Sequence, residues 1–589
     1  MNSDNTPAPI DPRFGSIQLA QLPLFQALST EALAAVAECL EVLWLPAGQD
    51  LFKQGDPPDA LFILVAGAMA VLLEPIEKSG ALTWLGVVRA GETVGEMALL
   101  SGKVRNATVR ALRDCEVLRF KRSDFEALMT LQAPAMLHIA RVAFQRLEAI
   151  RTVSASARRA GKAFAVVPAA LGVNVIEFAL ELADSLARFG SVALVREAQF
   201  SNAGTADFHA LEQANAYLLY VAEQASGSWF ELCRRQSDEV LWFAIAEQSP
   251  IETTRSPVQV DTLKVQRLVL RHRQDIVPGA AQKWRLACHT SLLHHICSLS
   301  DIDRVARFLT GNATGLVLGG GGARGFAHLG VLRALREAGL QIDCVAGTSI
   351  GAIVAAGTAM QWSDEELYFR NHRAFVQSNP LADYTLPFVA LVAGRRASAR
   401  LLQEYDQLRI EDMPLPFFCI SSNLTDGTVM EHRSGLLWHA LRASIAIPGV
   451  LPPVFAGGQV LVDGGVINNL PVDVMRRELH GRLIGVDISG DYAITAKVEE
   501  YDSPAMWRMS LDWILKRKVR PSILQILLRS GMVNSASKAE QNRRITDVLI
   551  KPPVEQIELM DWQAFDRAID IGYRHTRGLL ERGDFELSR

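Results

Sequence analysis

The sequence of 589 residues has only seven cysteines, which are scattered along the chain with no C-x-x-C pair. A disulfide framework or a thiol-ligated metal site needs paired or regularly spaced cysteines, so neither is expected. An odd number of scattered cysteines is typical of reduced cytosolic proteins. We therefore expect a cytoplasmic chain with no metal site.

We also expect neither a secretion signal nor an uninterrupted membrane span. Its first residues, MNSDNTPAPIDPRF, have Pro and Asp where a signal peptide has a basic start and an apolar run. Two uncharged stretches, 344–363 and 443–462, are long enough to cross a bilayer. Gly, Ser and Thr interrupt the first and three prolines interrupt the second, so neither is expected to span a membrane.

A surplus of positive charge is absent too. The chain has 60 Lys and Arg against 64 Asp and Glu, a net charge of −4, so we expect no nucleic-acid partner that binds through bulk charge. The 49% of hydrophobic residues is enough for several cores. At roughly 150 residues per domain, the length predicts three to four domains.

The first domain is predicted over residues 20–140. Short strand-like runs alternate there with turns such as 46–48 and 55–58, a pattern typical of an all-β roll. Residues 133–159 then follow the spacing of one long connecting helix. The segment 141–300 joins this connector to alternating strand and helix candidates, which predicts a small α/β domain without an evident active site.

The first candidate catalytic residue lies in a region of two glycine-rich turns further along the chain. A buried strand enters the glycine loop GGGGARG at 319–325, and the next strand enters G-T-S-I-G at 347–351. A strand that ends at the first Gly and a helix that begins after the Ser form a nucleophile elbow. We therefore predict Ser349 as a nucleophile, with Gly347 and Gly351 as the glycines of the elbow.

A candidate base for this hydroxyl lies downstream. A predicted hairpin over 454–462 leads into D-G-G at Asp463, although Asp-Gly also occurs as an ordinary turn. The competing arrangement is a Ser-Asp-His triad, in which the histidine comes last in the chain. His480 and His575 are the only histidines after Asp463.

Four ordered motifs resemble those of the patatin-like phospholipases. They are GGGGARG at 319–325, GTSIG at 347–351, SIAIPGVLPP at 444–453 and DGGVINNLP at 463–471. The stretch 304–351 is particularly similar to the neuropathy target esterase branch of that family. The resemblance implies a patatin-like α/β hydrolase domain, which we expect over residues 312–490.

The resemblance also implies a Ser–Asp dyad, with Ser349 as nucleophile and Asp463 as base, acting on lysophospholipids or phospholipids. A solvated Asp, with a pKa of about 3.9, is a poor base near neutral pH, so a working dyad must be desolvated and directly hydrogen-bonded. No metal or cofactor is required for this chemistry. The implied oxyanion hole is the backbone of Gly320, Gly321, Gly322, Ala323 and Arg324. The Arg324 side chain either holds this loop or meets a phosphate head group.

A second resemblance lies in the β-roll. The runs VGEMALL at 94–100 and RNAT at 105–108 are similar to the phosphate-binding cassette of cyclic nucleotide-binding domains. This implies a cyclic nucleotide effector whose phosphate meets Arg105 and helix N–H groups, and whose ribose hydroxyl meets Glu96. The implied contact residues are Gly95, Glu96, Arg105 and Asn106.

Residues 491–589 are predicted to be a helical extension of the catalytic domain. Within them, residues 507–529 combine Trp, Ile and Leu with six cations and one anion, a local charge of +5. Amphipathic helices on an anionic lipid surface and a solvated helix pair explain this pattern equally well. Peripheral association with the cytoplasmic face of a membrane is therefore one of two interpretations, and the sequence leaves the oligomeric state open.

The patterns together predict a multidomain chain made of a β-roll, a small α/β domain and a patatin-like hydrolase domain. The leading interpretation is a serine esterase that releases fatty acyl groups, regulated by a cyclic nucleotide. One alternative is a catalytically silent sensor and membrane adaptor. Another is a dinucleotide-binding oxidoreductase, because Gly320 to Gly325 fit G-x-G-x-x-G with Asp343 eighteen residues later.

Overall fold

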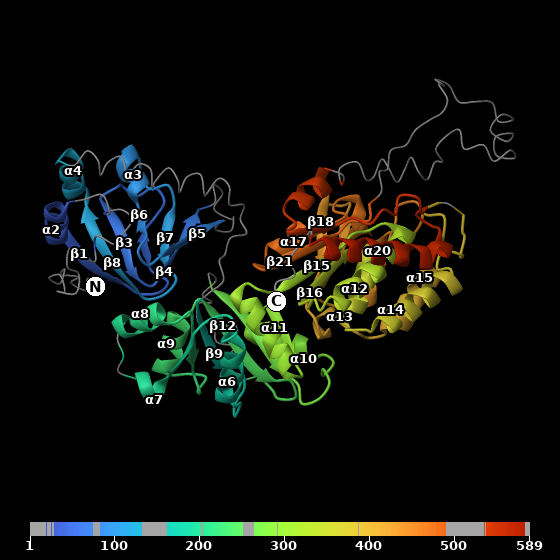
Figure 1. Ribbon diagram of the computed structural model, residues 1–589, viewed down its shortest axis with the longest axis horizontal. Coiled ribbons are helices and arrows are strands. Elements are labelled where there is room, and N and C mark those ends of the chain that lie inside the picture. The colour runs from blue at the N-terminus through green and yellow to red at the C-terminus, as the bar shows by residue number, and fades with distance from the viewer. Residues whose placement is uncertain are drawn as a thin grey trace, which may run out of the picture. The chain divides into compact units, whose positions relative to one another are not determined.

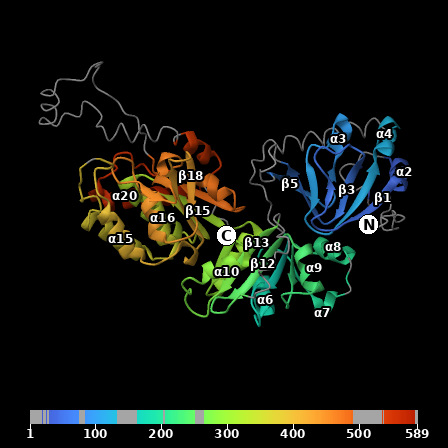
Figure 2. The same ribbon diagram turned by 180° about the vertical axis from the view of Figure 1, so that it is seen from behind.

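The computed structural model forms two compact units, one of residues 1–273 with 284–311 and one of residues 274–283 with 312–589. Figure 1 colours the chain by residue number, and Figure 2 shows it from behind. The described residues are 19, 25, 29–74, 83–131, 162–201, 203, 205–250, 264–290, 292–386, 388–489, 535 and 537–583.

The first unit begins with a β-roll of two four-stranded sheets. One sheet has the order β1 (Leu40–Leu45), β8 (Cys115–Lys121), β3 (Ala60–Ala66) and β6 (Thr93–Val94). The other has the order β2 (Asp50–Phe52), β7 (Thr108–Ala111), β4 (Ala68–Leu73) and β5 (Thr83–Arg89). Three helices accompany them: α2 (Thr30–Cys39), α3 (Glu96–Ser101) and α4 (Arg122–Leu131). All residues of β3 except the partly buried Val65 are buried, so the roll has a core of its own.

The rest of the first unit is built on a six-stranded sheet. Its order is β10 (Val192–Arg196), β11 (Tyr217–Val221), β9 (Ala163–Pro168), β12 (Glu239–Ile245), β13 (Val265–Arg271) and β14 (Leu292–Ile296). All five pairings are parallel. The helices are α6 (Val175–Leu186), α7 (Glu197–Phe200), α8 (Thr205–Ala214), α9 (Ser228–Gln236), α10 (Ala280–Cys288) and α11 (Leu299–Thr310). Residues 280–283 at the start of α10 are assigned to the second unit. A parallel sheet is covered on both faces, which explains why every residue of β9 is buried.

The second unit contains an eight-stranded mixed sheet. Its order is β19 (Val454–Ala456), β20 (Gln459–Asp463), β17 (Phe417–Asn423), β16 (Cys344–Thr348), β15 (Thr314–Leu318), β21 (Arg482–Val486) and β22 (Val548–Ile550), and β18 (Thr428–His432) also pairs with β17. The five strands from β17 to β22 run parallel to one another, whereas β18 and β20 are antiparallel to β17. Strands β15 and β16 are therefore central, and the two glycine-rich turns follow their carboxyl ends.

Helices pack closely around this sheet. They are α12 (Ala327–Glu337), α13 (Ile350–Ala359), α14 (Asp364–Asn371), α15 (Arg395–Tyr405), α16 (Leu437–Ser444), α17 (Val472–Arg476) and α20 (Phe565–Arg582). Helices α12 and α20 lie side by side (Figure 1). A Cβ atom on Gly330 would lie 2.0 Å from the carbonyl oxygen of Ile569, and one on Gly572 would lie 2.1 Å from that of Ala327. Glycine at both positions is what lets the two backbones approach so closely.

Candidate active site

A tight turn after β16 carries Ser349. Strand β16 ends at Thr348 and α13 begins at Ile350, so Ser349 is the single residue between strand and helix. Its backbone angles are φ +56° and ψ −126°, a region that residues other than Gly rarely occupy. This is the geometry of a nucleophile elbow, which holds the side chain above the end of the sheet.

Gly347 and Gly351, two positions before and after Ser349, are packed too closely against the backbone to carry a side chain. A Cβ atom on Gly347 would lie 2.4 Å from the carbonyl oxygen of Gly351, and one on Gly351 would lie 2.3 Å from that of Leu318. Any side chain at either position would force the strand and the helix apart. The spacing G-x-S-x-G is therefore a consequence of the turn that positions the hydroxyl.

Ser349 and Asp463 are in direct contact. The Ser349 Oγ donates a hydrogen bond of 2.6 Å to Oδ2 of Asp463, and the other carboxylate oxygen accepts one of 2.8 Å from the N–H of Gly465. Asp463 is the last residue of β20 and pairs across the ladder with Ser421. The side chains lie 114 positions apart in sequence, yet the topology of the sheet brings them together.

Burial changes the acidity of this carboxyl group. Asp463 is only 2% exposed, and the loss of solvation raises its pKa from 3.8 to about 6. The hydrogen bonds from Ser349 and Gly465 act in the opposite direction but do not cancel the effect of burial. The carboxylate is therefore mostly ionised at neutral pH, yet a much stronger base than a solvated Asp.

The glycine loop lies beside Ser349 and has two kinds of backbone amide. The N–H groups of Gly320 and Ala323 are already used, because they donate to the carbonyl oxygens of Asn469 and Leu559 at 3.2 and 2.8 Å. No acceptor within the described part of the chain takes the N–H of Gly321 or Gly322. These two amides of the predicted set are thus available to a ligand.

Two polar residues that the sequence analysis did not name hold the site in shape. Asn469 donates its side-chain amide to the carbonyl oxygen of Gly320 at 3.0 Å, which ties the glycine loop to the segment after Asp463. Ser444 accepts the N–H of Ser349 at 2.9 Å. Both residues lie within the motifs that carried the resemblance, so the signal was present but did not distinguish them from their neighbours.

Three family models match the chain. Residues 316–476 match the patatin-like phospholipase, residues 42–131 the cyclic nucleotide-binding domain, and residues 161–307 the P-loop-like domain of the neuropathy target esterase family. The chain thus combines a match to a domain named for the neuropathy target esterase family with matches to a cyclic nucleotide-binding domain and a patatin-like phospholipase. The two family resemblances seen in the sequence and the predicted multidomain fold class are confirmed.

Similar proteins cover most of the chain. A protein named lysophospholipase nte1 from Aspergillus fumigatus is 27% identical over 92% of this chain and 42% of its own length. An uncharacterized NTE family protein from Mycobacterium tuberculosis is 29% identical over 96% of both chains. The chain therefore spans less than half the length of the fungal relative.

In this patatin-like domain no histidine is part of the contact between Ser349 and Asp463. Within the described residues, the groups that influence the Asp463 carboxyl are Ser349 and Gly465. The triad candidates His480 and His575 are hydrogen-bonded to neither dyad residue in that part of the chain. The geometry is that of two residues in direct contact.

Arg324 follows the free amides of the glycine loop and turns away to a later segment. Its Nε donates to the carbonyl oxygen of Ile557 at 2.7 Å, and Nη2 donates to that of Glu555 at 3.4 Å. The side chain therefore ties the loop to residues more than 200 positions away in sequence. Of the two roles considered for Arg324, this contact corresponds to holding the loop.

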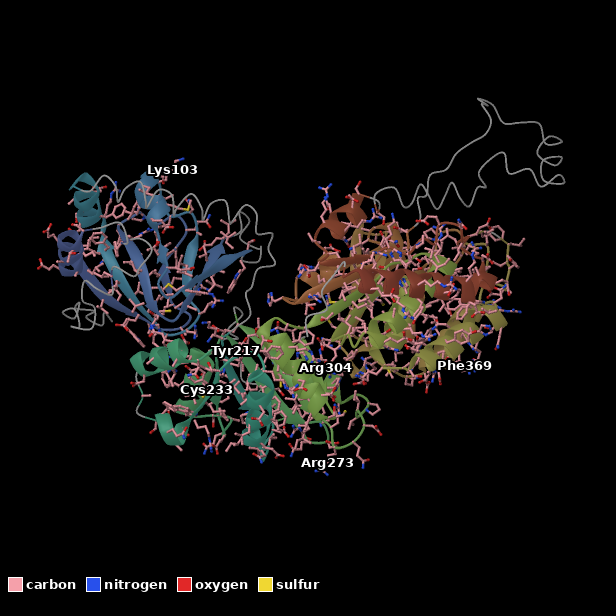
Figure 3. The ribbon with its side chains drawn as sticks, viewed as in Figure 1. Lys103, Tyr217, Cys233, Arg273, Arg304 and Phe369 are labelled. Atoms are coloured by element: carbon pink, nitrogen blue, oxygen red, sulfur yellow. The ribbon has the colours of Figure 1, made fainter. Side chains whose placement is uncertain are left out.

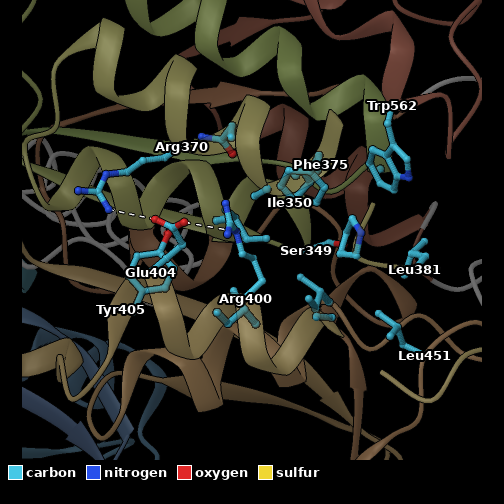
Figure 4. Close-up of a pocket in the computed structure, with 18 of the residues that line it drawn as sticks. Ser349, Ile350, Arg370, Phe375, Leu381, Arg400, Glu404, Tyr405, Leu451 and Trp562 are labelled. Atoms are coloured by element: carbon cyan, nitrogen blue, oxygen red, sulfur yellow. Dashed lines mark hydrogen bonds and ion pairs between the residues drawn. The ribbon is translucent and has the colours of Figure 1, made fainter. Parts of the chain in front are cut away.

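A mostly apolar pocket opens at Ser349 (Figure 4). Its apolar wall consists of Ile350, Ile353, Trp362, Ala374, Phe375, Pro380, Leu381, Ala397, Leu401, Tyr405, Ile445, Ile447, Leu451 and Trp562. At one end Glu404 lies between Arg370 and Arg400, with N–O distances of 3.0 and 3.4 Å (Figure 4). The pocket thus combines a nucleophile with a surface suited to a hydrocarbon chain.

In the β-roll, the arginine of the candidate nucleotide cassette is already paired with groups of the chain itself. Helix α3 begins after Gly95, and Glu96 is 3% exposed. Arg105 is 1% exposed and donates to the carbonyl oxygens of Gly95 and Ala60 and to Asp59 at 2.7 to 3.0 Å. Asn106 is exposed. A bound phosphate would compete with Asp59 for this guanidinium.

Two predicted features lie outside the described residues. They are the connecting helix expected at 133–159 and the cationic segment at 507–529. None of the helices in the described ranges is long and apolar enough to span a membrane.

Proposed function

We propose that the patatin-like domain hydrolyses carboxylic esters of lysophospholipids or phospholipids through a Ser349–Asp463 dyad. The observation that carries this proposal is the 2.6 Å hydrogen bond between the two side chains, buried at the end of an apolar pocket. The name of the fungal relative supports the choice of a lysophospholipid among esters.

In the proposed reaction, Asp463 removes the hydroxyl proton as Ser349 Oγ attacks the ester carbonyl carbon. The resulting oxyanion accepts hydrogen bonds from the N–H groups of Gly321 and Gly322, and one such donor is typically worth about 3–4 kcal/mol. Collapse breaks the ester bond, and the leaving alcohol oxygen takes the proton from Asp463. Water, deprotonated by the same carboxylate, then attacks the acyl-enzyme. The acyl–oxygen bond to Ser349 breaks, Oγ takes the proton back from Asp463, and the fatty acid is released.

The contacts of Asp343 argue against a dinucleotide-binding oxidoreductase. A ribose-binding carboxylate must be available at the end of its strand. Asp343 is instead fully buried, and its Oδ2 accepts the backbone N–H of Thr314 at 2.8 Å. The fingerprint match of the glycine loop therefore lacks the acidic partner that it needs.

The wild-type chain is expected to be labelled by a fluorophosphonate probe and to release fatty acid from lysophosphatidylcholine, as followed by mass spectrometry. Both results are expected because the probe and the substrate need the same activated hydroxyl. Intact folding with neither reaction would favour the silent sensor and adaptor. A nicotinamide-dependent absorbance change without labelling would favour the oxidoreductase.

We further propose that a cyclic nucleotide is an effector of the β-roll. The expected result is calorimetric binding of cyclic AMP or cyclic GMP by the wild type, together with a changed rate of ester hydrolysis. Arg105→Lys should weaken binding, because a lysine keeps the charge but cannot pair with a phosphate in a bidentate manner. No heat of binding and unchanged activity at saturating nucleotide would remove this proposal.

The proposed location is the cytoplasm, with peripheral association at the membrane face. The scattered cysteines of the sequence support the first part. The second part follows from a lipid substrate, because a phospholipid is presented to an enzyme mainly at a bilayer surface.

A further inference from the structure

Four large apolar side chains project from one loop near the pocket. In the apolar loop, here defined as residues 384–391 without the undescribed 387, Tyr384 is 81% exposed, Leu386 72%, Phe388 89% and Val389 61%. Single exposed apolar residues are ordinary on protein surfaces. Four within six positions are not, and such a patch marks an interaction site.

Hydrogen bonds hold the base of this loop in place. The N–H of Thr385 donates to the carbonyl oxygen of Leu391 at 3.0 Å, and the N–H of Leu391 donates to that of Gly449 at 2.9 Å. The next residue, Val392, donates to Val450 at 3.1 Å. The apolar side chains are therefore presented by an ordered turn.

The same base forms part of the wall of the Ser349 pocket. Val392 packs in one apolar cluster with Leu451, Leu381 and Ile445. Leu451, Leu381 and Ile445 line the pocket, and Figure 4 labels the first two of them. The base of the apolar loop thus packs against the wall of the pocket that contains Ser349.

Two exposed arginines stand next to the apolar loop. Arg395 and Arg396 are the first two residues of α15, and both are exposed. The Asp383 carboxylate caps this end of the helix, because it accepts the N–H of Arg396 at 3.1 Å. Positive side chains at a helix N-terminus are disfavoured by the helix dipole. Both side chains are exposed beside the apolar loop, where their positive charge can meet an external anion.

We propose that the apolar loop inserts into the surface of an anionic phospholipid bilayer, with Arg395 and Arg396 on the lipid phosphates. Apolar and aromatic side chains flanked by arginines are the usual composition of an interfacial anchor. Docked in this way, the mouth of the pocket faces the lipids from which a substrate is drawn. This inference rests on the proposed function for its substrate, but membrane binding can be tested without it.

The test is cosedimentation with vesicles of phosphatidylcholine containing phosphatidylglycerol. The double variant Leu386→Asp and Phe388→Asp is expected to lower the partition coefficient at least tenfold. Leu171→Asp is the matched control, because Leu171 is a 79% exposed leucine in a loop of the other unit. Arg395→Gln with Arg396→Gln should weaken binding to the anionic vesicles and leave binding to pure phosphatidylcholine unchanged.

Activity separates the two proposals. Hydrolysis of vesicle-borne lysophospholipid should fall with the loop variant, whereas hydrolysis of a soluble p-nitrophenyl ester should not change. Unchanged vesicle binding by the loop variant, or an equal loss with Leu171→Asp, would overturn the membrane inference. So would a wild-type dimer that the loop variant converts to a monomer, since the loop would then be a subunit contact. Vesicle binding without hydrolysis of either ester would leave the inference standing and reject the proposed function.

Discussion

Ser349→Ala is expected to lower kcat/KM for ester hydrolysis by about four orders of magnitude or more. The hydroxyl is the only group of the pocket that forms a covalent bond in the proposed mechanism, and alanine offers no substitute. Residual turnover would come from water held near the free amides of Gly321 and Gly322. The measurement is the steady-state rate with lysophosphatidylcholine, together with the loss of fluorophosphonate labelling.

Ser363→Ala is the matched control for this variant. Ser363 is the N-cap of α14, and its side chain accepts the N–H of Glu366 at 3.1 Å. Its removal should cost about 1 kcal/mol of stability and leave hydrolysis nearly unchanged. A Ser349→Ala enzyme that keeps a tenth of the wild-type rate would contradict the assignment of the nucleophile.

The elbow could be predicted from sequence because its determinants are local. A buried strand, a glycine, the serine and a second glycine follow one another within 344–351, and the observed contacts of Gly347 and Gly351 explain that order. Asp463 could be named because a strand end and D-G-G frame it. The distance between Asp463 and Ser349 could not be predicted, because it depends on β17 lying between β16 and β20 in the sheet.

Other parts of the site had no local signal. The pairing of Gly320 with Asn469, and of Ala323 with Leu559, decides which amides stay free, and no sequence pattern specifies such long-range partners. Strand β22 completes the sheet although it follows β21 by about 60 residues. The sequence also contains no sign that Tyr384, Leu386, Phe388 and Val389 are exposed, because an apolar run of that length also fits a buried strand.

Exposed aromatic side chains are not all equivalent in this domain. Phe369, on α14, is 68% exposed, and it lies on the outside of the catalytic unit (Figure 3). It adjoins Glu365, Glu366 and Arg373 in a separate polar groove. Phe388 has apolar neighbours in its own loop instead. The distinction is why the loop, and not every exposed aromatic residue, is interpreted as a lipid-binding surface.

Asp463→Asn is expected to abolish most activity while leaving the dyad geometry in place. The asparagine amide can donate to the Ser349 hydroxyl, and its carbonyl oxygen can still accept the N–H of Gly465. It cannot take a proton, so a loss of roughly four orders of magnitude in kcat/KM is expected. The measurement is the rate at pH 7.5, and retention of a tenth of the wild-type rate would show that another group is the base.

The same substitution is expected to stabilise the fold. The wild-type carboxyl has a pKa of about 6 when folded against 3.8 for the ordinary group, so the folded state loses stability as the pH rises from about 4 to about 6. At 1.4 kcal/mol for each of about two pKa units, the cost above pH 6 is on the order of 3 kcal/mol. Asp463→Asn removes that cost, so its free energy of unfolding should exceed that of the wild type at pH 7.5 and match it at pH 4. Denaturant unfolding at both values measures the difference. Equal stability at pH 7.5 would mean that burial does not destabilise the ionised carboxylate. Its pKa would then not be raised, and Asp463 would not be the strong base that the dyad requires.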